Sequence, residues 1–293
     1  MPESLSYRLS VCIKKKRSLK RFFDENVTDG KKPELLKWQD RAVGWTALHL
    51  STVERNGEAI ADILHLVPNS ELWRYLKVLT RLKNTAVQIA ARWNLTDTLK
   101  LIFAKVSRSS DCTNCVVDLL LHQNSEGKNA LLCAADYNNF EAVQLLIKTA
   151  ESATTDKLLL YKMLSVCDKN GRSILHMMSQ FPSCTKILEF ILKTVKHPEH
   201  KERLYCLQDC EGNTALHRFA GNYKEDGIKL LLHHMSGFRT TSVLREPNDC
   251  GQMPIHFARS ETTKFHLNWA EKITDEFYYL RTAPCLCDHV QHL

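Results

Sequence analysis

The stretch GNTALHRF, which runs from Gly212 to Phe219, decides the fold because five variants of it occur elsewhere in the chain. The copies begin 39 to 44 residues apart, and a phrase that returns at a near-constant period is the signature of a repeat architecture. Repeat chains build extended surfaces on which other molecules dock. The six copies are GWTALHLS from Gly44, KNTAVQIA from Lys83, GKNALLCA from Gly127, GRSILHMM from Gly171, GNTALHRF from Gly212 and GQMPIHFA from Gly251.

The third copy shows the anatomy of one repeat. Residues 124–127 read Asn-Ser-Glu-Gly, which is turn chemistry because Asn bonds to its own following backbone and Gly tolerates positive φ. We predict a first helix over 130–135, a break at Asn138 and Asn139, and an amphipathic second helix over 140–147. Such a hairpin cannot bury its apolar faces alone, so it must stack on copies of itself. Further second helices are expected at 59–66, 98–103, 185–192 and 225–232.

These features resemble the ankyrin repeat, whose motif is Gly-x-Thr-Pro-Leu-His-x-Ala. Residues 212–217 match the motif with Ala215 in place of proline, and the copy from Lys83 departs furthest because Gln88 replaces the histidine. The resemblance covers residues 40–265 and implies an all-α ankyrin-repeat solenoid of six stacked helix-turn-helix hairpins. It leaves residues 1–39 as a basic N-terminal cap segment and residues 266–293 as a C-terminal extension.

The repeats are longer than the resemblance implies. Ankyrin units have about 33 residues, and the surplus here follows each second helix. Lengthening a loop twofold costs only about 0.6 kcal/mol, so these insertions do not by themselves indicate function. Two of them, at 71–79 and 156–164, are expected to be helical. The insertions are 68–82, 104–123, 149–166, 194–207 and 235–246.

Composition places the chain among ordinary globular proteins. The 11 cysteines are odd in number and scattered, which favours a reducing compartment and therefore a cytoplasmic or nuclear location. No stretch approaches the ~20 apolar residues of a membrane helix, so we expect no membrane partner. Most of the net charge of +7 lies in the first 41 residues. The repeats are nearly neutral, so we expect no direct contact with nucleic acid.

The N-terminal charge is concentrated in Lys14-Lys15-Lys16-Arg17 and continues to Arg21. Three interpretations remain open. The run is the solvated face of a helix that caps the array, or a nuclear import signal, or a contact with membrane or nucleic acid.

Histidine and cysteine raise the question of metal binding. His49, His176, His217 and His256 share one repeat position, and copies a whole repeat apart are too far from one another for shared ligation at ~2 Å. The resemblance implies that each imidazole bonds to turn backbone instead. We therefore predict no metal and no cofactor. Zinc remains an alternative at Cys112 and Cys115, and at a C-terminal set, Cys285, Cys287, His289 and His292.

Catalytic motifs are missing from the sequence. It contains no phosphate-binding G-x-x-x-x-G-K-[ST], no G-x-S-x-G and no H-E-x-x-H. We therefore predict that the chain is not an enzyme.

Aromatic residues recur at one position of the repeat. Trp93, Tyr137 and Phe181 each lie ten residues after their motif begins, and Tyr223 lies one residue beyond that position. The resemblance places this point on the concave groove of the array. Trp and Tyr dominate binding hot spots, so these four residues are the candidate protein-binding residues. The alternative is that each ring packs against its neighbour and seals the gap between repeats.

The predicted function is therefore protein binding through the groove and the elaborated turn edge. With six repeats and long insertions, the array resembles the inhibitors of nuclear factor kappa B, which bind transcription-factor dimers. That resemblance implies a transcription factor as the partner. Two alternatives are a substrate adaptor of a ubiquitin ligase and a viral or pathogen host-mimic.

Overall fold

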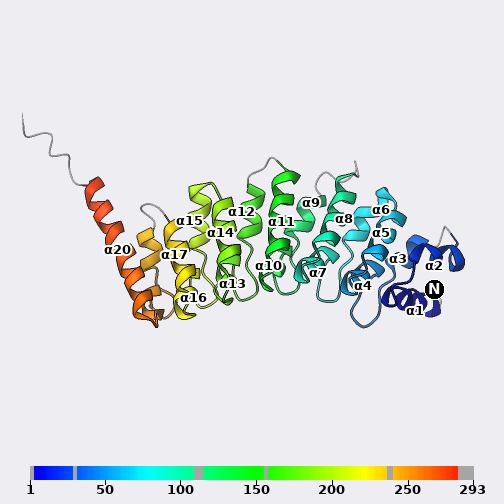
Figure 1. Ribbon diagram of the computed structural model, residues 1–293, viewed down its shortest axis with the longest axis horizontal. Helices are drawn as coiled ribbons and strands as arrows, with labels where there is room; N and C mark the ends of the chain where they lie inside the picture. Colours follow the sequence, from blue (N-terminus) through cyan, green and yellow to red (C-terminus); the bar gives the residue numbers. More distant parts are fainter. Residues whose placement is uncertain (1–2, 29–31, 109–114, 155–157, 236–239, 283–293) are drawn as a thin grey trace, which may run out of the picture. The chain divides into compact units, whose positions relative to one another are not determined.

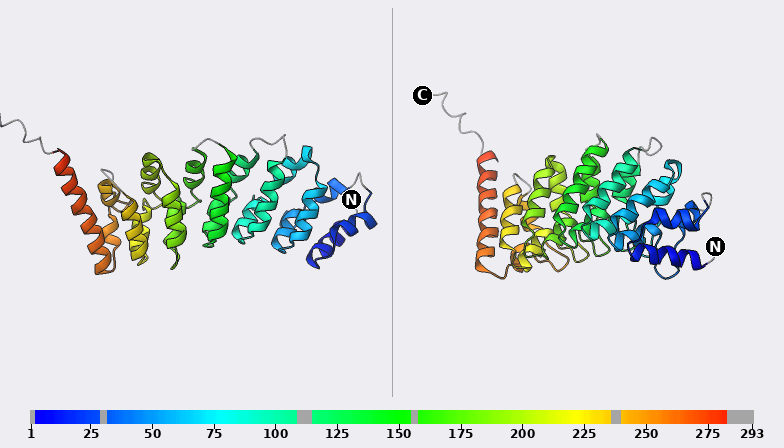
Figure 2. Two further views of the ribbon diagram at one scale, coloured as in Figure 1. Left: turned by 45° about the horizontal axis from the view of Figure 1, so that its top comes forward. Right: turned by 45° about the vertical axis from the view of Figure 1, so that its right-hand side comes forward.

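The computed structural model describes residues 3–28, 32–108, 115–154, 158–235 and 240–282, which belong to two compact units. One unit comprises residues 1–174 and the other residues 175–293. Helices make up the regular structure of both units (Figure 1, Figure 2). Over the described ranges, the β pairing is limited to an isolated bridge between Gln208 and Thr214. The expected all-α repeat solenoid is confirmed.

The first unit contains twelve described helices. They are α1 Glu3–Lys14, α2 Leu19–Asn26, α3 Lys32–Lys37, α4 Ala47–Val53, α5 Gly57–Leu66, α6 Asn69–Leu76, α7 Ala86–Arg92, α8 Thr96–Ser107, α9 Cys115–Leu121, α10 Ala130–Ala135, α11 Phe140–Ala153 and α12 Leu158–Leu164.

The second unit contains the remaining described helices, the first of which begins at the boundary between the units. They are α13 Ile174–Met178, α14 Thr185–Thr194, α15 Pro198–Tyr205, α16 Ala215–Gly221, α17 Glu225–His234, α18 Thr240–Arg245, α19 Pro254–Phe257 and α20 Glu261–Thr282.

The first helices of the first unit begin where the motif places Thr or Asn. The side chains of Thr46, Thr85 and Asn129 accept a hydrogen bond from the N–H three residues on, at 3.5, 3.3 and 2.8 Å. A cap of this kind satisfies an N–H that has no partner within the helix, and it stabilises the helix by about 1 kcal/mol. The motif therefore fixes the start of α4, α7 and α10.

The helices of the first unit form two rows. One row is α4, α7 and α10, each packed on the next, and α5, α8 and α11 form the other (Figure 1). Ala90 and Ala134 are completely buried, and their small side chains let α7 and α10 approach closely. The rows are the predicted stack of hairpins, and the second helices run a few residues longer than predicted.

Each of the five insertions contains a short helix. These are α6, α9, α12, α15 and α18. The sequence predicts helices at 71–79 and 156–164, and the structure places them at 69–76 and 158–164. In the first unit, α9 packs against α8 of its own repeat and against α10 and α11 of the next. The insertions are therefore a third set of helices and not loose loops.

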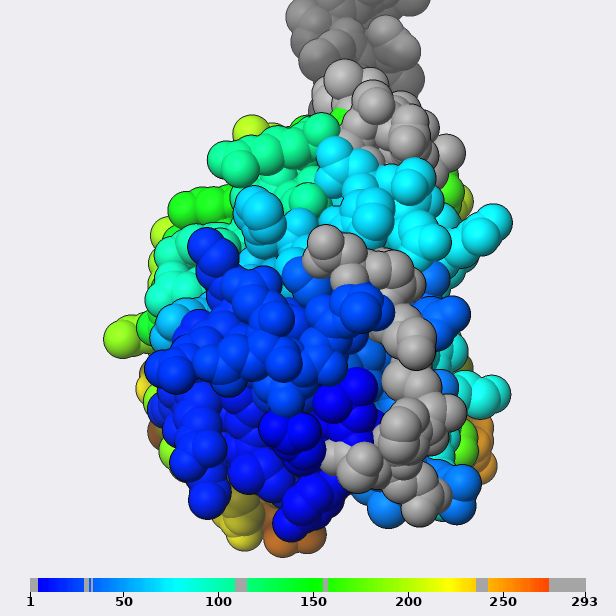
Figure 3. All heavy atoms as spheres, turned by 90° about the vertical axis from the view of Figure 1, so that its right-hand side faces the viewer, coloured from blue at the N-terminus to red at the C-terminus, as the bar shows by residue number. Residues whose placement is uncertain are grey.

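The N-terminal segment adds a hairpin to the first unit. Helix α1 packs on α4 and α2 packs on α5, so the two helices occupy the places of a first and a second repeat helix. Leu9, Ile13, Leu19 and Phe23 are buried in this contact region. Figure 3 looks at the face of the first unit that these two helices, in blue, form.

The last helix departs from the predicted boundary at residue 266. Helix α20 begins at Glu261, directly after the short α19, and passes through residue 266 without a break. It packs on α17, α18 and α19, with Thr263, Leu267 and Ala270 buried. Helix α20 therefore takes the place of the second helix of the sixth repeat.

Candidate protein-docking groove

A residue with left-handed backbone opens every copy of the motif. The five motif glycines have φ between 71° and 74°, and Lys83 adopts 57° at the same place in the second copy. Three residues earlier, or four in the first copy, an Asp, Asn or Thr side chain accepts from the following N–H groups. Asp40, for example, bonds to the N–H groups of Ala42 and Val43 at 2.8 and 2.9 Å. These bonds hold each turn in a fixed shape at the edge of the groove.

Polar side chains behind the turns join one repeat to the next in the first unit. Nδ1 of His49 accepts from the N–H of Thr46 at 3.2 Å, and its buried Nε2 lies toward the backbone of Asn84 without reaching hydrogen-bond geometry. Gln88 takes the place of the histidine in the second copy. Its Oε1 accepts from the N–H of Thr85 at 2.8 Å, and its Nε2 donates to the carbonyl of Lys128 at 2.8 Å. The departure from the motif at Gln88 therefore preserves the bonding pattern.

The third copy has leucine at the histidine position and bonds differently. The buried Asn129 caps α10 through its oxygen and donates through Nδ2 to the carbonyl of Met163 at 2.9 Å. In the third copy, the cap residue Asn129 therefore makes the bond to the following segment, because no histidine is present to make it.

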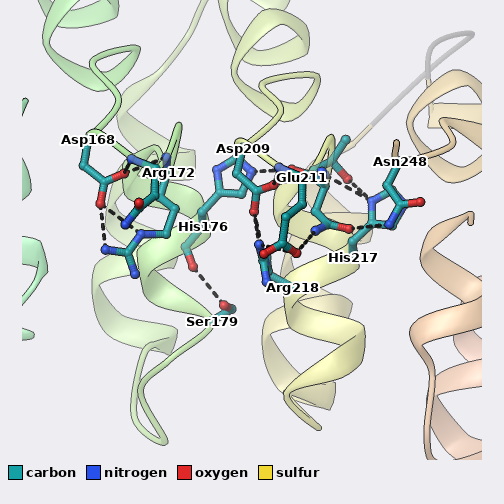
Figure 4. Close-up of polar contacts among 12 residues, drawn as sticks. Asp168, Arg172, His176, Ser179, Asp209, Glu211, His217, Arg218 and Asn248 are labelled. Carbon is teal, nitrogen blue, oxygen red and sulfur yellow. Dashed lines mark hydrogen bonds and ion pairs between the residues drawn. The ribbon is translucent and has the colours of Figure 1, made fainter. Parts of the chain in front are cut away.

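The second unit carries the same framework (Figure 4). His176 and His217 each place Nε2 at 2.9 Å from a carbonyl oxygen of the following turn, those of Asn213 and Gln252. The predicted bonding of these histidines to turn backbone is confirmed. Burial lowers the pKa of His217, and in the first unit it lowers the pKa of His49 to about 4. Both rings are therefore neutral at pH 7, as a framework role requires.

An ion-pair cluster backs the turn at Asp209. Its carboxylate accepts from the N–H groups of Glu211 and Asn213 at 3.0 Å and pairs with Arg218 at 2.5 Å (Figure 4). Burial alone would raise the pKa of Asp209, but these backbone bonds and the guanidinium outweigh it and lower the pKa. Arg218 also lies 3.1 Å from Glu211, so the turn is tied to α16.

A hollow of about 820 Å³ lies on the first unit between the turn tips and the first helices. Gln88, Ile89 and Cys133 of α7 and α10 line it, together with the exposed Leu82. Lys128 and Asp136 pair at 2.7 Å within it and offset each other's charge. Arg81 and Arg92 also line the hollow and give it a positive balance against Glu126.

Arginine and aromatic side chains alternate along one wall of this hollow. The guanidinium carbon of Arg92 lies 4.7 Å from the ring centroid of Tyr137 and 6.0 Å from that of Trp93. Arg92 also donates to the hydroxyl of Tyr137. Arg55 lies 5.8 Å from the Trp93 centroid on the preceding repeat. Trp93 and Tyr137 remain 45% and 43% exposed, so much of both rings faces solvent.

The four predicted binding residues divide between the units. Trp93 and Tyr137 lie on the first unit, joined through Arg92. Phe181 and Tyr223 lie on the second, where Phe181 is half-buried and Tyr223 is 58% exposed. Tyr223 has φ of 56°, in the left-handed region that bulky residues rarely occupy. Whether the four residues bind a protein stays a prediction.

Sequence reasoning missed the two arginines, Arg55 and Arg92. Arg92 directly precedes Trp93, and that adjacency is the one signal in the sequence that could have identified it. Its second aromatic neighbour, Tyr137, lies one repeat further along the chain and emerges only when the hairpins stack.

The predicted zinc alternatives find no support in the described part of the chain. Cys112 and the C-terminal set of Cys285, Cys287, His289 and His292 lie outside the described residues, and Cys115 is buried at the start of α9. Among the described residues, no group of three or more His, Cys, Asp or Glu side chains could hold a metal ion. No helix there has both the length and the hydropathy to cross a membrane.

Comparison with known proteins identifies the fold. The structure matches the ankyrin repeat domain of Bcl-3, a member of the IkappaB family, with a TM-score of 0.61 and 18% identity over 89% of this chain and 97% of that one. It also matches an ankyrin repeat domain from Acinetobacter baumannii with a TM-score of 0.54 and 17% identity over 78% of this chain and 97% of that one. No family profile and no curated protein sequence matches the chain. The likeness shows the ankyrin-repeat fold.

Proposed function

We propose that this ankyrin-repeat chain is a protein-binding module whose first unit holds its partner in the groove lined by Trp93, Arg92 and Tyr137. The observation that carries the proposal is the alternation of arginine and aromatic side chains along one wall, with both rings nearly half exposed. Exposed amphipathic rings beside a guanidinium are the side chains that supply most binding energy in protein interfaces.

The charges in the groove define the chemistry of the partner. Lys128 and Asp136 offset each other, so the wall presents the guanidinium groups of Arg81 and Arg92. A partner segment that places an apolar side chain against Trp93 and a carboxylate against Arg92 satisfies both features. Arginine binds carboxylates with two parallel hydrogen bonds, which gives the contact direction as well as energy.

Two tryptophans of similar exposure provide the test. Trp93 lines the groove and is 45% exposed, and Trp269 lies on α20 of the other unit and is 56% exposed. Proteins that bind the wild-type chain are identified by affinity capture and then titrated against both alanine variants. Trp93→Ala should weaken binding by about 2 kcal/mol or more, roughly thirtyfold, and Trp269→Ala should leave it unchanged. Equal affinities for wild type and Trp93→Ala would refute the proposal.

A finer proposal concerns the class of partner. The number of repeats and the likeness to the Bcl-3 domain support a transcription factor of the nuclear factor kappa B type. Titration with purified dimers of that type tests it directly, and absence of binding at micromolar protein would refute it. Capture of ubiquitin-ligase subunits would instead favour a substrate adaptor. A cytoplasmic and nuclear location belongs to the same proposal, and a fluorescent fusion tests it.

A further inference from the structure

The basic run is not a free peptide in the structure. Lys14 ends α1, and the four residues 15–18 form the whole link to α2. The N–H groups of Lys16 and Arg17 bond to carbonyls of α1 at 3.0 Å, with Lys16 in the left-handed region at φ of 50°. The thiol of Cys12 donates to the carbonyl of Arg17 at 3.6 Å. The link is therefore a folded helix cap, which disfavours its use as an extended import signal.

The charges of α2 run against its helix dipole. Its first turn contains Lys20 and Arg21 and no acidic residue, although a helix N-terminus favours negative charge. Asp24 and Glu25 lie toward the opposite end, where positive charge is favoured. Local helix stability therefore does not explain why cations gather here.

The cations are exposed and largely uncompensated. Lys14, Lys15, Lys16, Arg17 and Lys20 are exposed, and none forms an ion pair with a described carboxylate. Arg21 is the exception, since it pairs with Glu25 at 2.7 Å. We call Arg8, Lys14–Arg17, Lys20 and Arg21 the basic corner. Like charges held this close repel one another, so the corner favours an external anion.

A hollow of about 640 Å³ lies within the basic corner. Arg8, Arg17 and Arg21 line it, together with Tyr7, which is 69% exposed. Guanidinium groups bind phosphate oxygens through paired hydrogen bonds, and an exposed tyrosine is typical of the boundary between water and lipid. The hollow therefore suits the phosphate of a lipid headgroup, with Tyr7 at the boundary.

We propose that the basic corner docks on an anionic phospholipid surface. Helices α1 and α2 form the end face of the first unit that Figure 3 views, because their other sides pack on α4 and α5. A flat anionic surface can meet the whole corner at once. A nucleic-acid strand instead gains affinity from cations placed along successive phosphates, and the repeats that follow are nearly neutral. A cluster of four to eight cations is also the number typical of anionic-lipid binding.

Vesicle co-sedimentation of the full chain tests the proposal. Vesicles of phosphatidylcholine with phosphatidylserine should bind the protein, and vesicles of phosphatidylcholine alone should not. The variant with Lys14, Lys15, Lys16 and Arg17 all changed to Gln should lose affinity by roughly 1000-fold, which corresponds to about 1 kcal/mol for each cation. Binding should also fall steeply with salt, because these charges are exposed.

The control variant removes the same charge elsewhere. It changes four exposed lysines that form no ion pair with a carboxylate of the described residues, Lys148, Lys162, Lys169 and Lys196, to Gln, and it should bind vesicles as the wild type does. Changing Lys14, Lys15 and Lys16 to Arg should preserve binding, which separates loss of charge from loss of fold. Equal vesicle binding by the Gln variant and the control would overturn the proposal. So would binding to RNA or DNA oligonucleotides, or to an import receptor, without binding to anionic vesicles.

Discussion

Nε2 of His217 lies 2.9 Å from the carbonyl oxygen of Gln252, so the ring of one repeat is bonded to the turn of the next. Its Nδ1 accepts from the N–H of Thr214 at 3.1 Å, which places the ring proton on Nε2. A second proton on Nδ1 would turn that acceptor into a donor and break the cap. The cap of α16 therefore depends on a neutral imidazole, whereas the bond from Nε2 to the next repeat does not.

The first prediction concerns acid sensitivity. Burial lowers the pKa of His49 to about 4, against 6.5 for the ordinary group. Between these two pH values the imidazole is protonated in the unfolded chain and neutral in the folded chain. Stability from this residue is complete above pH 6.5 and is lost as the pH falls toward 4. The free energy of unfolding should drop by about 1 kcal/mol per pH unit in that window. Urea unfolding between pH 7.5 and 4 measures the slope.

Gln88 supplies the matched substitution, because a glutamine at this position bonds to its own cap and to the next repeat without titrating. His49→Gln should flatten the slope and leave stability at pH 7.5 nearly unchanged. His65→Gln, at an exposed position, should leave the slope as it is. An unchanged slope in His49→Gln would show that other groups cause the acid sensitivity.

The second prediction concerns Lys83. This residue adopts φ of 57° where the other five copies have glycine. A left-handed conformation costs a residue with a Cβ about 1–2 kcal/mol, and changing Lys83 to glycine removes this cost. The greater freedom of glycine in the unfolded chain offsets part of the stability gained. Lys83→Gly should therefore raise the free energy of unfolding by about 0.5–1 kcal/mol. Lys83→Ala keeps the strained Cβ and should give no gain, and an equal gain in both variants would refute the strain argument.

The third prediction compares two motif glycines with the same φ. A Cβ at Gly212 would lie 2.6 Å from the backbone nitrogen of Asp249, whereas one at Gly251 meets nothing within 4 Å. Gly251→Ala should cost about 1 kcal/mol for the left-handed conformation alone. Gly212→Ala should cost about 1–3 kcal/mol more, because the clash displaces the neighbouring turn. Thermal melts of both variants decide the matter, and similar melting temperatures would contradict it.

The fourth prediction concerns the core of the second unit. Leu216 is 1% exposed on α16, so Leu216→Ala should lower the free energy of unfolding by about 2–5 kcal/mol. The side chain of Glu211 is largely exposed; it pairs with Arg218 and accepts from Nδ2 of Asn213 at 3.1 Å, so Glu211→Ala should cost about 1 kcal/mol or less. Urea midpoints of the two variants measure the difference. Equal midpoints would contradict the assignment of Leu216 to the core.

The fifth prediction separates docking from packing at Tyr137. Its ring is 43% exposed and touches Arg92, so it fills no core position. Tyr137→Ala should lower the free energy of unfolding by about 1 kcal/mol or less, the size of an exposed cation–π contact. It should weaken binding of the captured partner by about 2 kcal/mol. A variant that melts early and binds with unchanged affinity would assign Tyr137 to packing.

The parts of the fold that depend on local sequence could be predicted. The turn at residues 124–127 and the helix start after Asn129 follow from side chains within a few residues of one another. The helices α9 and α15 could not be identified in this way. A segment such as Cys115–Leu121 is too short for its apolar pattern to distinguish a helix from a strand, and Val116 and Val117 favour strands.

The candidate groove was predicted only in part. The shared register of Trp93 and Tyr137 is visible in the sequence, and so is their place on the repeat. The role of Arg92 is not, because its contact with Tyr137 joins residues 45 positions apart. Their approach depends on how closely α7 and α10 pack, and the small residues of both helices set that distance.

The short helix α9 has a consequence for how the first unit unfolds. It contacts α8 on one side, α10 and α11 on the other, and α12 beyond them, and Lys77 reaches across to Asp118 at 3.6 Å. In a one-dimensional array, the balance between intrinsic repeat stability and nearest-neighbour coupling decides whether repeats melt singly or together. A helix shared between neighbours adds to the coupling term as well as to the stability of its own repeat. Loss of one inner repeat would then expose surface on both sides, so we expect the whole unit to melt in a single sharp transition.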